Sequence, residues 1–302
     1  MKHPTVLHIA SEVEPFSKTG GLADVAGALP RALEASGFKC VVVTPLYASI
    51  DPARHGLARR LRPVTVELGD ERIDVIVYEG TLRGGRVPVF LIDHEVYRRK
   101  GLCGEGGEDY PDNAKRFALL SAGALAVCDA LGIEVDIVHA HDWHAGLAPV
   151  FARAAGKSSV FTIHNAAFAG RFPAADVAGL GIPPEVFEPS GEILYLKAGI
   201  VAADLVTTVS PRYARELQTE EFGGALCDFY RANKAKLSGI ANGIDQATWN
   251  PATDPHLPAR YSADDLDGKA MCKAELRREV GLAASATDAP DPPLFGVVSR
   301  LA

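Results

Sequence analysis

The first group in the sequence that could do chemistry is a lysine followed by two glycines, Lys18-Thr19-Gly20-Gly21, between a strand-like run and a helical one. Glycines let the backbone approach a ligand closely, and the start of a helix offers N–H groups and positive potential to an anion. Lysine adds a point charge suited to phosphate. The run lacks the spacing of the dinucleotide and P-loop fingerprints. Its position alone predicts a phosphate site, with a tight turn carrying a surface lysine as the alternative.

A second group, residues 139–144 (HAHDWH), ends another strand-like run. Three histidines and an aspartate suggest a metal, but no cysteine or glutamate completes a familiar spacing, so we predict none. We expect His139 to be buried packing, Asp142 to hydrogen-bond to a sugar, and Trp143 to stack on one. The alternative is that Asp142 caps a helix starting at His144 and that Trp143 belongs to the core.

The third group is His164-Asn165, which directly follows the strand-like run 159–163. Open α/β sheets bind their ligands outside the carboxyl ends of the strands. We therefore predict that both residues belong to a binding site, although a single histidine here is also often ordinary satisfied structure.

Alternating strand and helix patterns must position these groups. Thr5–Ala10 and Lys39–Thr44 are apolar runs typical of buried strands, and Leu22–Ala35 has helical spacing, so they predict a βαβ unit. Residues 62–93 predict strands joined by tight turns. The alternation then resumes and predicts an α/β fold, a Rossmann-like parallel sheet with helices on both faces. The later predicted helices are Asn113–Leu131, His144–Ala155, Glu192–Ala203, Pro211–Leu217 and Lys269–Val280, and the later strands Asp136–Ala140, Ser159–Ile163, Leu205–Val209 and Leu237–Ala241.

The end of the sequence predicts a domain boundary. Residues 1–282 are expected to form one domain, and residues 283–293, which are small, polar and proline-rich, a linker. Leu294–Ser299 then has the pattern of a buried strand with nothing to pair with. We expect residues 294–302 to be the first strand of a truncated second domain.

Composition excludes several classes of protein. The 302 residues carry a net charge of −7, which disfavours binding to nucleic acid or to an anionic membrane surface. The five cysteines are scattered and form no C-x-x-C pair, which indicates reduced thiols in a cytoplasmic chain. We recognise no secretion signal and no stretch apolar enough to span a bilayer.

Several motifs together resemble the glycogen and starch synthases of bacterial type, which belong to glycosyltransferase family 5. The pattern S-E-x-x-P-[FL]-x-K-T-G-G-L-A-D-V is matched from Ser11 to Val25. The resemblance implies the N-terminal half of a two-domain, GT-B-type enzyme that transfers glucose from ADP-glucose to an α-1,4-glucan, without a cofactor. It continues, in order, through residues 27–30 (GALP), 139–144 (HAHDWH), 162–165 (TIHN), 207–211 (TTVSP), 242–245 (NGID) and 299–301 (SRL).

The resemblance also implies roles for single residues. Lys18, Thr19, Asp24 and the backbone of Gly20 and Gly21 are expected to hold the ADP diphosphate.

Three further residues are implied to be catalytic. His164 is expected to donate a hydrogen bond to the donor sugar, Arg300 to neutralise the leaving phosphate, and Asp142 to contact the acceptor sugar. The residues implied to contact glucose or glucan are Glu12, Tyr97, Trp143 and Asn165. Arg98-Arg99-Lys100 and Cys103 depart from the aromatic and proline pattern that the family has around Tyr97.

The implied chemistry is retaining transfer through an oxocarbenium-like transition state, with front-face attack assisted by the leaving phosphate. It needs cations and N–H dipoles at that phosphate and no protein nucleophile. The family's second-domain lysine and its downstream glutamate motif are not in these 302 residues, so we expect no turnover by the chain alone.

Three alternatives remain open at this point. An NAD(P)-dependent oxidoreductase shares the βαβ start, but the G-x-G-x-x-G fingerprint and an acidic residue after the second strand are both lacking. A non-catalytic glucan-binding domain would bind maltooligosaccharide and ignore ADP. Another glycosyltransferase of the same two-domain type would use a different nucleotide sugar. The sequence does not predict an oligomeric state.

Overall fold

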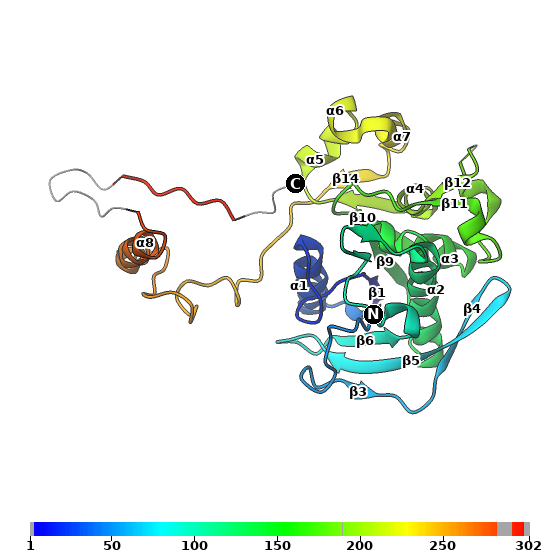
Figure 1. Cartoon of the computed structure of the whole chain (residues 1–302), viewed down its shortest axis with the longest axis horizontal. Helices are drawn as coiled ribbons and strands as arrows, with labels where there is room; N and C mark the ends of the chain where they lie inside the picture. Colours follow the sequence, from blue (N-terminus) through cyan, green and yellow to red (C-terminus); the bar gives the residue numbers. More distant parts are fainter. Residues whose placement is uncertain (1–2, 189, 283–291, 299–302) are drawn as a thin grey trace. The chain divides into compact units, whose positions relative to one another are not determined.

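A ten-stranded sheet forms the centre of the computed structural model, in which residues 3–188, 190–282 and 292–298 are described. The strand order is β14-β13-β10-β9-β1-β2-β6-β5-β3, and β4 pairs with β5 beside this path (Figure 1). The strands are β1 Thr5–Ile9, β2 Lys39–Pro45, β3 Ala58–Arg59, β4 Val64–Leu68, β5 Glu71–Thr81, β6 Pro88–Asp93, β9 Ile137–His141, β10 Ser158–Ile163, β13 Leu205–Thr208 and β14 Leu237–Gly239.

The middle of the sheet contains a reversal of strand order. The strands from β14 to β6 all pair in parallel, as predicted. From β1 the chain passes through α1 (Gly21–Ala35) to β2 on one side, whereas from β9 it passes through α3 (Ala148–Ala154) to β10 on the other. Such a switch point leaves a crevice outside the carboxyl ends of β1 and β9. The Lys18 turn follows β1 and Asp142 follows β9, so the fold brings both predicted groups to this point.

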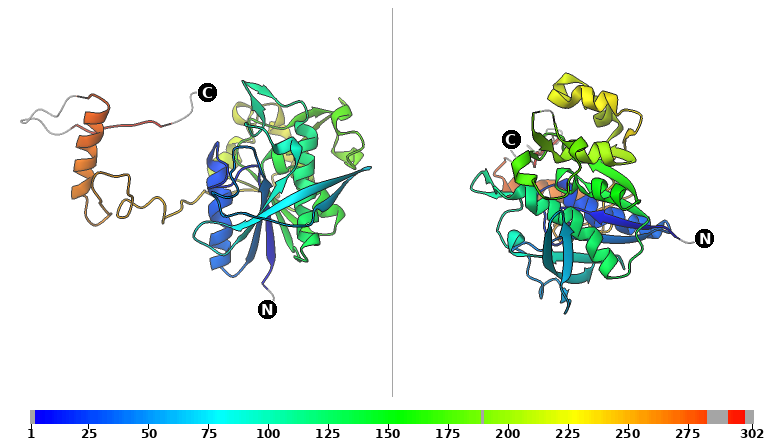
Figure 2. Two further views of the ribbon diagram at one scale, coloured as in Figure 1. Left: turned by 60° about the horizontal axis from the view of Figure 1, so that its bottom comes forward. Right: turned by 90° about the vertical axis from the view of Figure 1, so that its right-hand side faces the viewer.

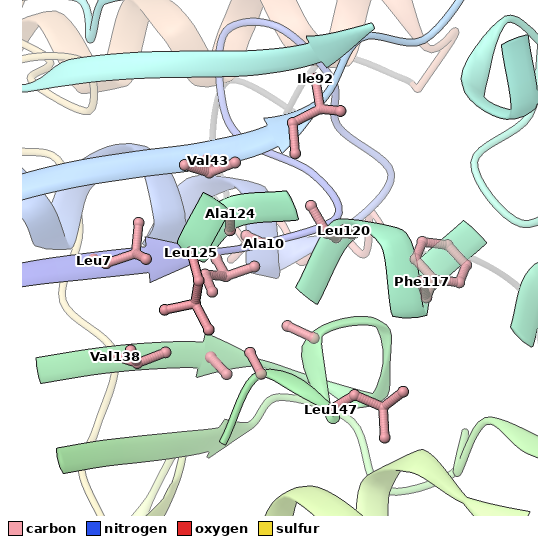
Figure 3. Close-up of a cluster of buried hydrophobic side chains, with 14 of the residues drawn as sticks. Leu7, Ala10, Val43, Ile92, Phe117, Leu120, Ala124, Leu125, Val138 and Leu147 are labelled. Carbon is pink, nitrogen blue, oxygen red and sulfur yellow. The ribbon is translucent and has the colours of Figure 1, made fainter. Parts of the chain in front are cut away.

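Helices cover both faces of the sheet, as predicted. Figure 2 shows α1 on one side of the strands and α2 (Asn113–Ala130) on the other. Apolar residues of α2, among them Leu120 and Ala124, point toward Leu7 of β1 and Ile92 of β6 and form the core (Figure 3). The remaining helices are α4 Tyr195–Ala202, α5 Pro211–Glu216, α6 Glu220–Gly223, α7 Cys227–Ala232 and α8 Asp267–Glu279, with short 3-10 turns η1 Glu95–Tyr97, η2 Trp143–Ala145, η3 Ala174–Val177, η4 Pro184–Val186 and η5 Gly224–Leu226.

One edge of the sheet is antiparallel, and it is formed mainly by the segment 62–93, for which strands joined by tight turns were predicted. β5 pairs antiparallel with β6, β4 and β3, and Gly69 turns the chain from β4 into β5 with a φ of +61°. In β4, Val64, Val66 and Leu68 are buried while the residues between them are exposed. This alternation is what an antiparallel strand with one solvated face requires.

Three predicted elements differ from the structure. The helix predicted over Glu192–Ala203 begins at Tyr195, because Glu192–Leu194 pairs as β12 with β11 (Arg171–Pro173). The helix predicted over His144–Ala155 is divided into η2 and α3, and Pro149 lies in the first turn of α3, where a missing N–H costs nothing. Residues 294–298 form no strand, and Ser299 lies outside the described residues. A short hairpin, β7 Gly104–Glu105 with β8 Glu108–Asp109, occupies the glycine-rich segment.

Contacts between residues divide the chain into two units, residues 1–243 and 244–302. The first contains the sheet and all of the candidate site described below. The second contains α8, none of whose residues is buried. The boundary predicted after residue 282 therefore stays a prediction, and most of the predicted linker, residues 283–291, lies outside the described residues. No helix in the described part of the chain is both long and apolar enough to cross a membrane.

Candidate active site

The glycine turn after β1 is held by a buried carboxylate. Oε2 of Glu12, which is 5% exposed, accepts hydrogen bonds from the Thr19 backbone N–H and from Thr19 Oγ1, the latter at 2.9 Å. A carboxylate held by two donors is a rigid support for the turn. Glu12 therefore shapes the loop that carries Lys18 and the two glycines.

The helix that follows begins without a side-chain cap. Gly20, its N-cap, has no side chain to accept a hydrogen bond, so the first N–H groups of α1 lack one of their usual partners. A Cβ added to Gly21 would meet nothing within 4 Å, and Gly21 has no positive φ. Neither packing nor conformation therefore requires glycine at position 21. N–H groups that lack a side-chain cap and lie beside open space can donate to an anion close to the backbone.

Lys18 is held above this helix start by an exposed ion pair. Its Nζ lies 2.6 Å from Oδ1 of Asp24, which stands in the first turn of α1. The hydrogen bond to Asp24 raises the pKa of Lys18, so the amine is charged at neutral pH. Exposed pairs of this kind contribute about 0–1 kcal/mol. A phosphate could therefore exchange for Asp24 at little cost.

Asp142 joins the ends of β9 and β10. Its Oδ1 accepts hydrogen bonds from the backbone N–H of His164 at 2.6 Å and of Asn165 at 3.2 Å. It caps no helix, since η2 has no side-chain cap bond, and the alternative reading of Asp142 as a helix cap is therefore wrong. Asp142 also has a φ of +55°, a conformation that costs a non-glycine residue about 1–3 kcal/mol and that clusters at functional sites.

Asp142, His164 and Asn165, at the ends of β9 and β10, form what we call the Asp142 corner. Burial has the largest effect on the pKa values there. Burial raises the pKa of Asp142 to about 7, against the opposing effect of its two backbone hydrogen bonds, and the nearby Glu12 raises it further. Burial lowers the pKa of His164 to about 4, so its imidazole is neutral at neutral pH. A carboxyl group poised near neutrality beside a neutral imidazole can hold or release a proton as its surroundings change.

His164 and Asn165 begin the loop after β10. Nε2 of His164 lies 3.0 Å from Nδ1 of His141, and this hydrogen bond holds the His164 ring in place. The Asn165 side chain accepts from the Ala167 N–H at 3.0 Å and so shapes its own loop. The predicted His164-Asn165 pair is thus gathered with Asp142, and Glu12 is close enough to influence the Asp142 pKa.

Trp143 is not brought to the surface of the site. Its ring stacks on that of His144 at 4.0 Å between centroids, and the indole is 8% exposed. A Cβ on Gly170 would lie 2.3 Å from the indole, so the Gly170 backbone packs directly against it. The indole has little free surface for a sugar, and the alternative that it belongs to the core describes its position better.

Tyr97 is likewise buried, with no exposed side-chain surface. Its hydroxyl donates to the carbonyl of Arg116 at 2.6 Å, and its ring lies edge-on to Tyr47. The structure therefore places Tyr97 beneath the loops rather than among groups that a sugar could touch.

A histidine cluster lies under the site, and only part of it was singled out from the sequence. His8, His139 and His141 each offer a nitrogen within 4.8 Å of the others. The rings of His139 and His141 are stacked at 4.3 Å and 27°, and Nε2 of His139 already bonds Thr162 Oγ1 at 2.7 Å. Nitrogen lone pairs lie in the ring planes, so stacked rings do not aim at one ion. Within the cluster, His8 and His141 are hydrogen-bonded to each other, whereas His139 bonds Thr162.

A hollow of about 720 Å³ lies elsewhere, lined by residues that include Thr5, Lys39 and Gly132. Thr5 and Lys39 begin β1 and β2, so the hollow is at the amino ends of the strands. Ligands of open α/β sheets bind at the opposite ends. The glycine turn and the Asp142 corner are therefore the better candidate.

The family described as starch synthase catalytic domain matches residues 5–232. The chain belongs to this starch synthase family. The match contains every described residue of the site, from the glycine turn to the His164 loop. Arg300, the remaining predicted catalytic residue, lies outside both the match and the described residues.

Relatives and a solved structure agree with this family assignment. A glycogen synthase of Anaeromyxobacter dehalogenans is 47% identical over 98% of the chain, and one of Burkholderia thailandensis is 46% identical over the same share. The chain spans 63% and 57% of their lengths. The catalytic domain of starch synthase IV from Arabidopsis thaliana, solved with ADP and acarbose, superposes with a TM-score of 0.84 at 31% identity, over 95% of this chain and 61% of that one. The predicted GT-B-type fold is thereby confirmed.

Proposed function

We propose that this chain provides the acceptor-side half of a retaining glucosyltransferase that transfers glucose from ADP-glucose to the non-reducing end of an α-1,4-glucan. One observation carries the proposal: the uncapped, open start of α1 lies at the same switch point as the Asp142–His164 corner. The names of the relatives, and the ADP and acarbose bound to the solved starch synthase, support this choice of donor and acceptor.

The diphosphate is proposed to sit at the glycine turn. The N–H groups at Gly20 and Gly21 and the Lys18 ammonium would face the phosphate that gains negative charge as the glycosidic bond to ADP breaks. Such preorganised dipoles stabilise a leaving group because they need no reorganisation during the reaction. Thr19 acts through Glu12 by holding the turn in shape, and Asp24 releases Lys18 to the phosphate.

The sugar is proposed to lie over the Asp142 corner. His164 donates a hydrogen bond to the donor glucose, Asp142 fixes the loop that presents His164, and Asn165 faces the acceptor. Tyr97 and Trp143 support these loops from below. The leaving phosphate accepts the proton of the attacking glucan hydroxyl, so no protein nucleophile is assigned. Arg300 is proposed to add a second cation at that phosphate.

The remaining proposals concern the setting of the reaction. Five free thiols support a cytoplasmic location. The negative net charge disfavours nucleic acid and anionic membrane as partners. The chain spans less than two thirds of the length of its curated relatives, and we propose that it binds the ligands named above.

Isothermal titration of the chain with ADP tests the diphosphate site. Lys18→Ala should weaken ADP binding about fivefold, because a charge-assisted hydrogen bond of about 1.5–3 kcal/mol is partly offset by the competing Asp24 pair. Lys115→Ala is the matched control: Lys115, in α2, is similarly exposed and pairs with Glu71, the first residue of β5, at 2.6 Å. Equal ADP affinities for the two variants would place the diphosphate elsewhere. UDP, titrated in parallel, compares the two nucleotides.

A further inference from the structure

Three histidines form a continuous line from the core to the site. His8 lies in β1, His141 ends β9, and His164 follows β10, on three neighbouring strands. Nδ1 of His8 is 3.3 Å from Nε2 of His141, and Nδ1 of His141 is 3.0 Å from Nε2 of His164. His8 and His141 are fully buried. His141 thus uses both of its nitrogens to connect the other two rings.

Each ring in this line is neutral at neutral pH. Burial lowers the pKa of His8 and of His141 well below the usual value, and that of His164 to about 4. A neutral imidazole has one N–H donor and one acceptor nitrogen. The line can therefore run in only two ways, with every ring donating toward His164 or every ring donating toward His8.

The inner end of the line decides between these two directions. Nε2 of His8 is buried and has no partner in the described part of the chain. If every ring donated inward, this atom would carry an N–H with no acceptor. Orphaned buried N–H groups are rarer in proteins than under-satisfied acceptors. The bare lone pair therefore belongs on Nε2 of His8, and its proton on Nδ1.

The protons of the other two rings follow. His141 accepts at Nε2 from His8 and donates from Nδ1 to His164. His164 accepts at Nε2, which leaves its own proton on Nδ1. Within the described residues the ring of His164 bonds only through Nε2, and its Nδ1 is not among the buried unpartnered nitrogens, so Nδ1 is available to solvent or to a ligand.

We propose that His8 and His141 are positioning residues that fix the proton of His164 on Nδ1, so that His164 presents a hydrogen-bond donor to an oxygen of the bound sugar nucleotide. The last clause rests on the proposed function, whereas the tautomer assignment does not. The neighbouring branch, in which His139 bonds Thr162, does not reach the nitrogens of His164 and is not part of the line.

Nitrogen NMR of the chain labelled with [¹⁵N]histidine tests the assignment, because protonated and bare ring nitrogens resonate far apart. Removing each of the three histidines in turn assigns the signals. We expect all three rings to carry their proton on Nδ1, although an imidazole side chain in water favours Nε2. A protonated Nε2 on His164 would overturn the proposal.

Two substitutions separate a positioning role from simple packing. His141→Asn can place an amide N–H near the position of Nδ1 and should keep the proton of His164 on Nδ1. His141→Leu removes the donor and should raise the share of His164 protonated on Nε2 several-fold. His139→Asn, the control, should leave the His164 signals in place. If His141→Leu does not fold, the wild-type and His141→Asn spectra still decide.

Addition of ADP-glucose distinguishes the two proposals. If His164 carries its proton on Nδ1 and that signal moves on addition of ADP-glucose, both stand. If the tautomer is as assigned but ADP-glucose binds without moving the signal, the sugar contact fails and the histidine line remains. If the proton is on Nε2, the histidine line fails whatever ADP-glucose does.

Discussion

Asp142 offers a sharp test of the electrostatics at the site. Burial raises its pKa from 3.8 to about 7. The folded chain therefore binds this proton more tightly than the unfolded chain does. The resulting stability is fully present below pH 4 and is lost as the pH rises through about 7. With about 1.4 kcal/mol for each unit of pKa, the loss between these limits is about 4 kcal/mol.

Asp142→Asn should abolish this pH dependence. An amide oxygen can still accept from the N–H groups of His164 and Asn165, and it carries no charge at any pH. Urea unfolding of wild type and variant at pH 4 and pH 7.5 gives the difference in free energy of unfolding at each pH. From pH 4 to pH 7.5, the free energy of unfolding of Asp142→Asn should rise by about 4 kcal/mol relative to that of wild type. Comparing the variant with wild type cancels the contributions that other titratable groups make to the change of stability with pH. These groups include the buried histidines, whose lowered pKa values make stability rise with pH.

Asp204→Asn is the matched control. Asp204 also accepts a backbone N–H, that of Ser159 at 2.7 Å, but its side chain is exposed. Parallel stability profiles for wild type and Asp142→Asn would refute the reasoning, because they would mean that Asp142 titrates alike in the folded and unfolded chains.

Three further predictions concern the surroundings of the site. Trp143→Ala should lower the free energy of unfolding, measured in urea, by about 3–5 kcal/mol, while the folded variant keeps its ADP affinity. Loss of ADP binding at unchanged stability would instead show that the indole contacts the ligand. Thr19→Val removes the hydroxyl bond to Glu12 and should cost about 1 kcal/mol in the same assay, and a variant as stable as wild type would show that this bond contributes nothing. Gly21→Val should weaken ADP binding about tenfold or more in a calorimetric titration without loss of stability, since its side chain enters empty space; unchanged affinity would contradict a ligand there.

Local patterns predicted the elements that position the site. The apolar runs at β1 and β2 and the helical spacing between them identified the βαβ unit. The predicted strand ends after residues 140 and 163 identified the two polar groups, although β9 itself ends one residue later, at His141. Such signals depend on residues close together in the chain. For the antiparallel edge, the sequence predicted the tight turns within residues 62–93 but not which strands pair across the sheet, because that pairing depends on residues far apart in the chain.

The contacts beneath the site depend on residues far apart in the sequence. His8 lies in an apolar run, and only its meeting with His141, 133 positions later, shows that it belongs to the site's support. The indole of Trp143 is covered because Gly170 lacks a side chain at the place where the two meet.

The segment after Tyr97 is held by two ion pairs that join residues far enough apart to enclose it. Its two arginines form bidentate pairs with acidic residues that flank the segment, and these pairs hold the loop. The pairs are Arg98 with Asp93 and Arg99 with Asp112.

The central claim, that the uncapped start of α1 receives the diphosphate of a sugar nucleotide, can be measured directly. The chain labelled with [¹⁵N]glycine and titrated with ADP reports on each glycine amide separately. The account predicts that the amide signals of Gly20 and Gly21 move downfield together and saturate with the binding curve, as N–H groups that gain a phosphate oxygen do. Saturation of ADP binding with both signals unmoved would contradict it.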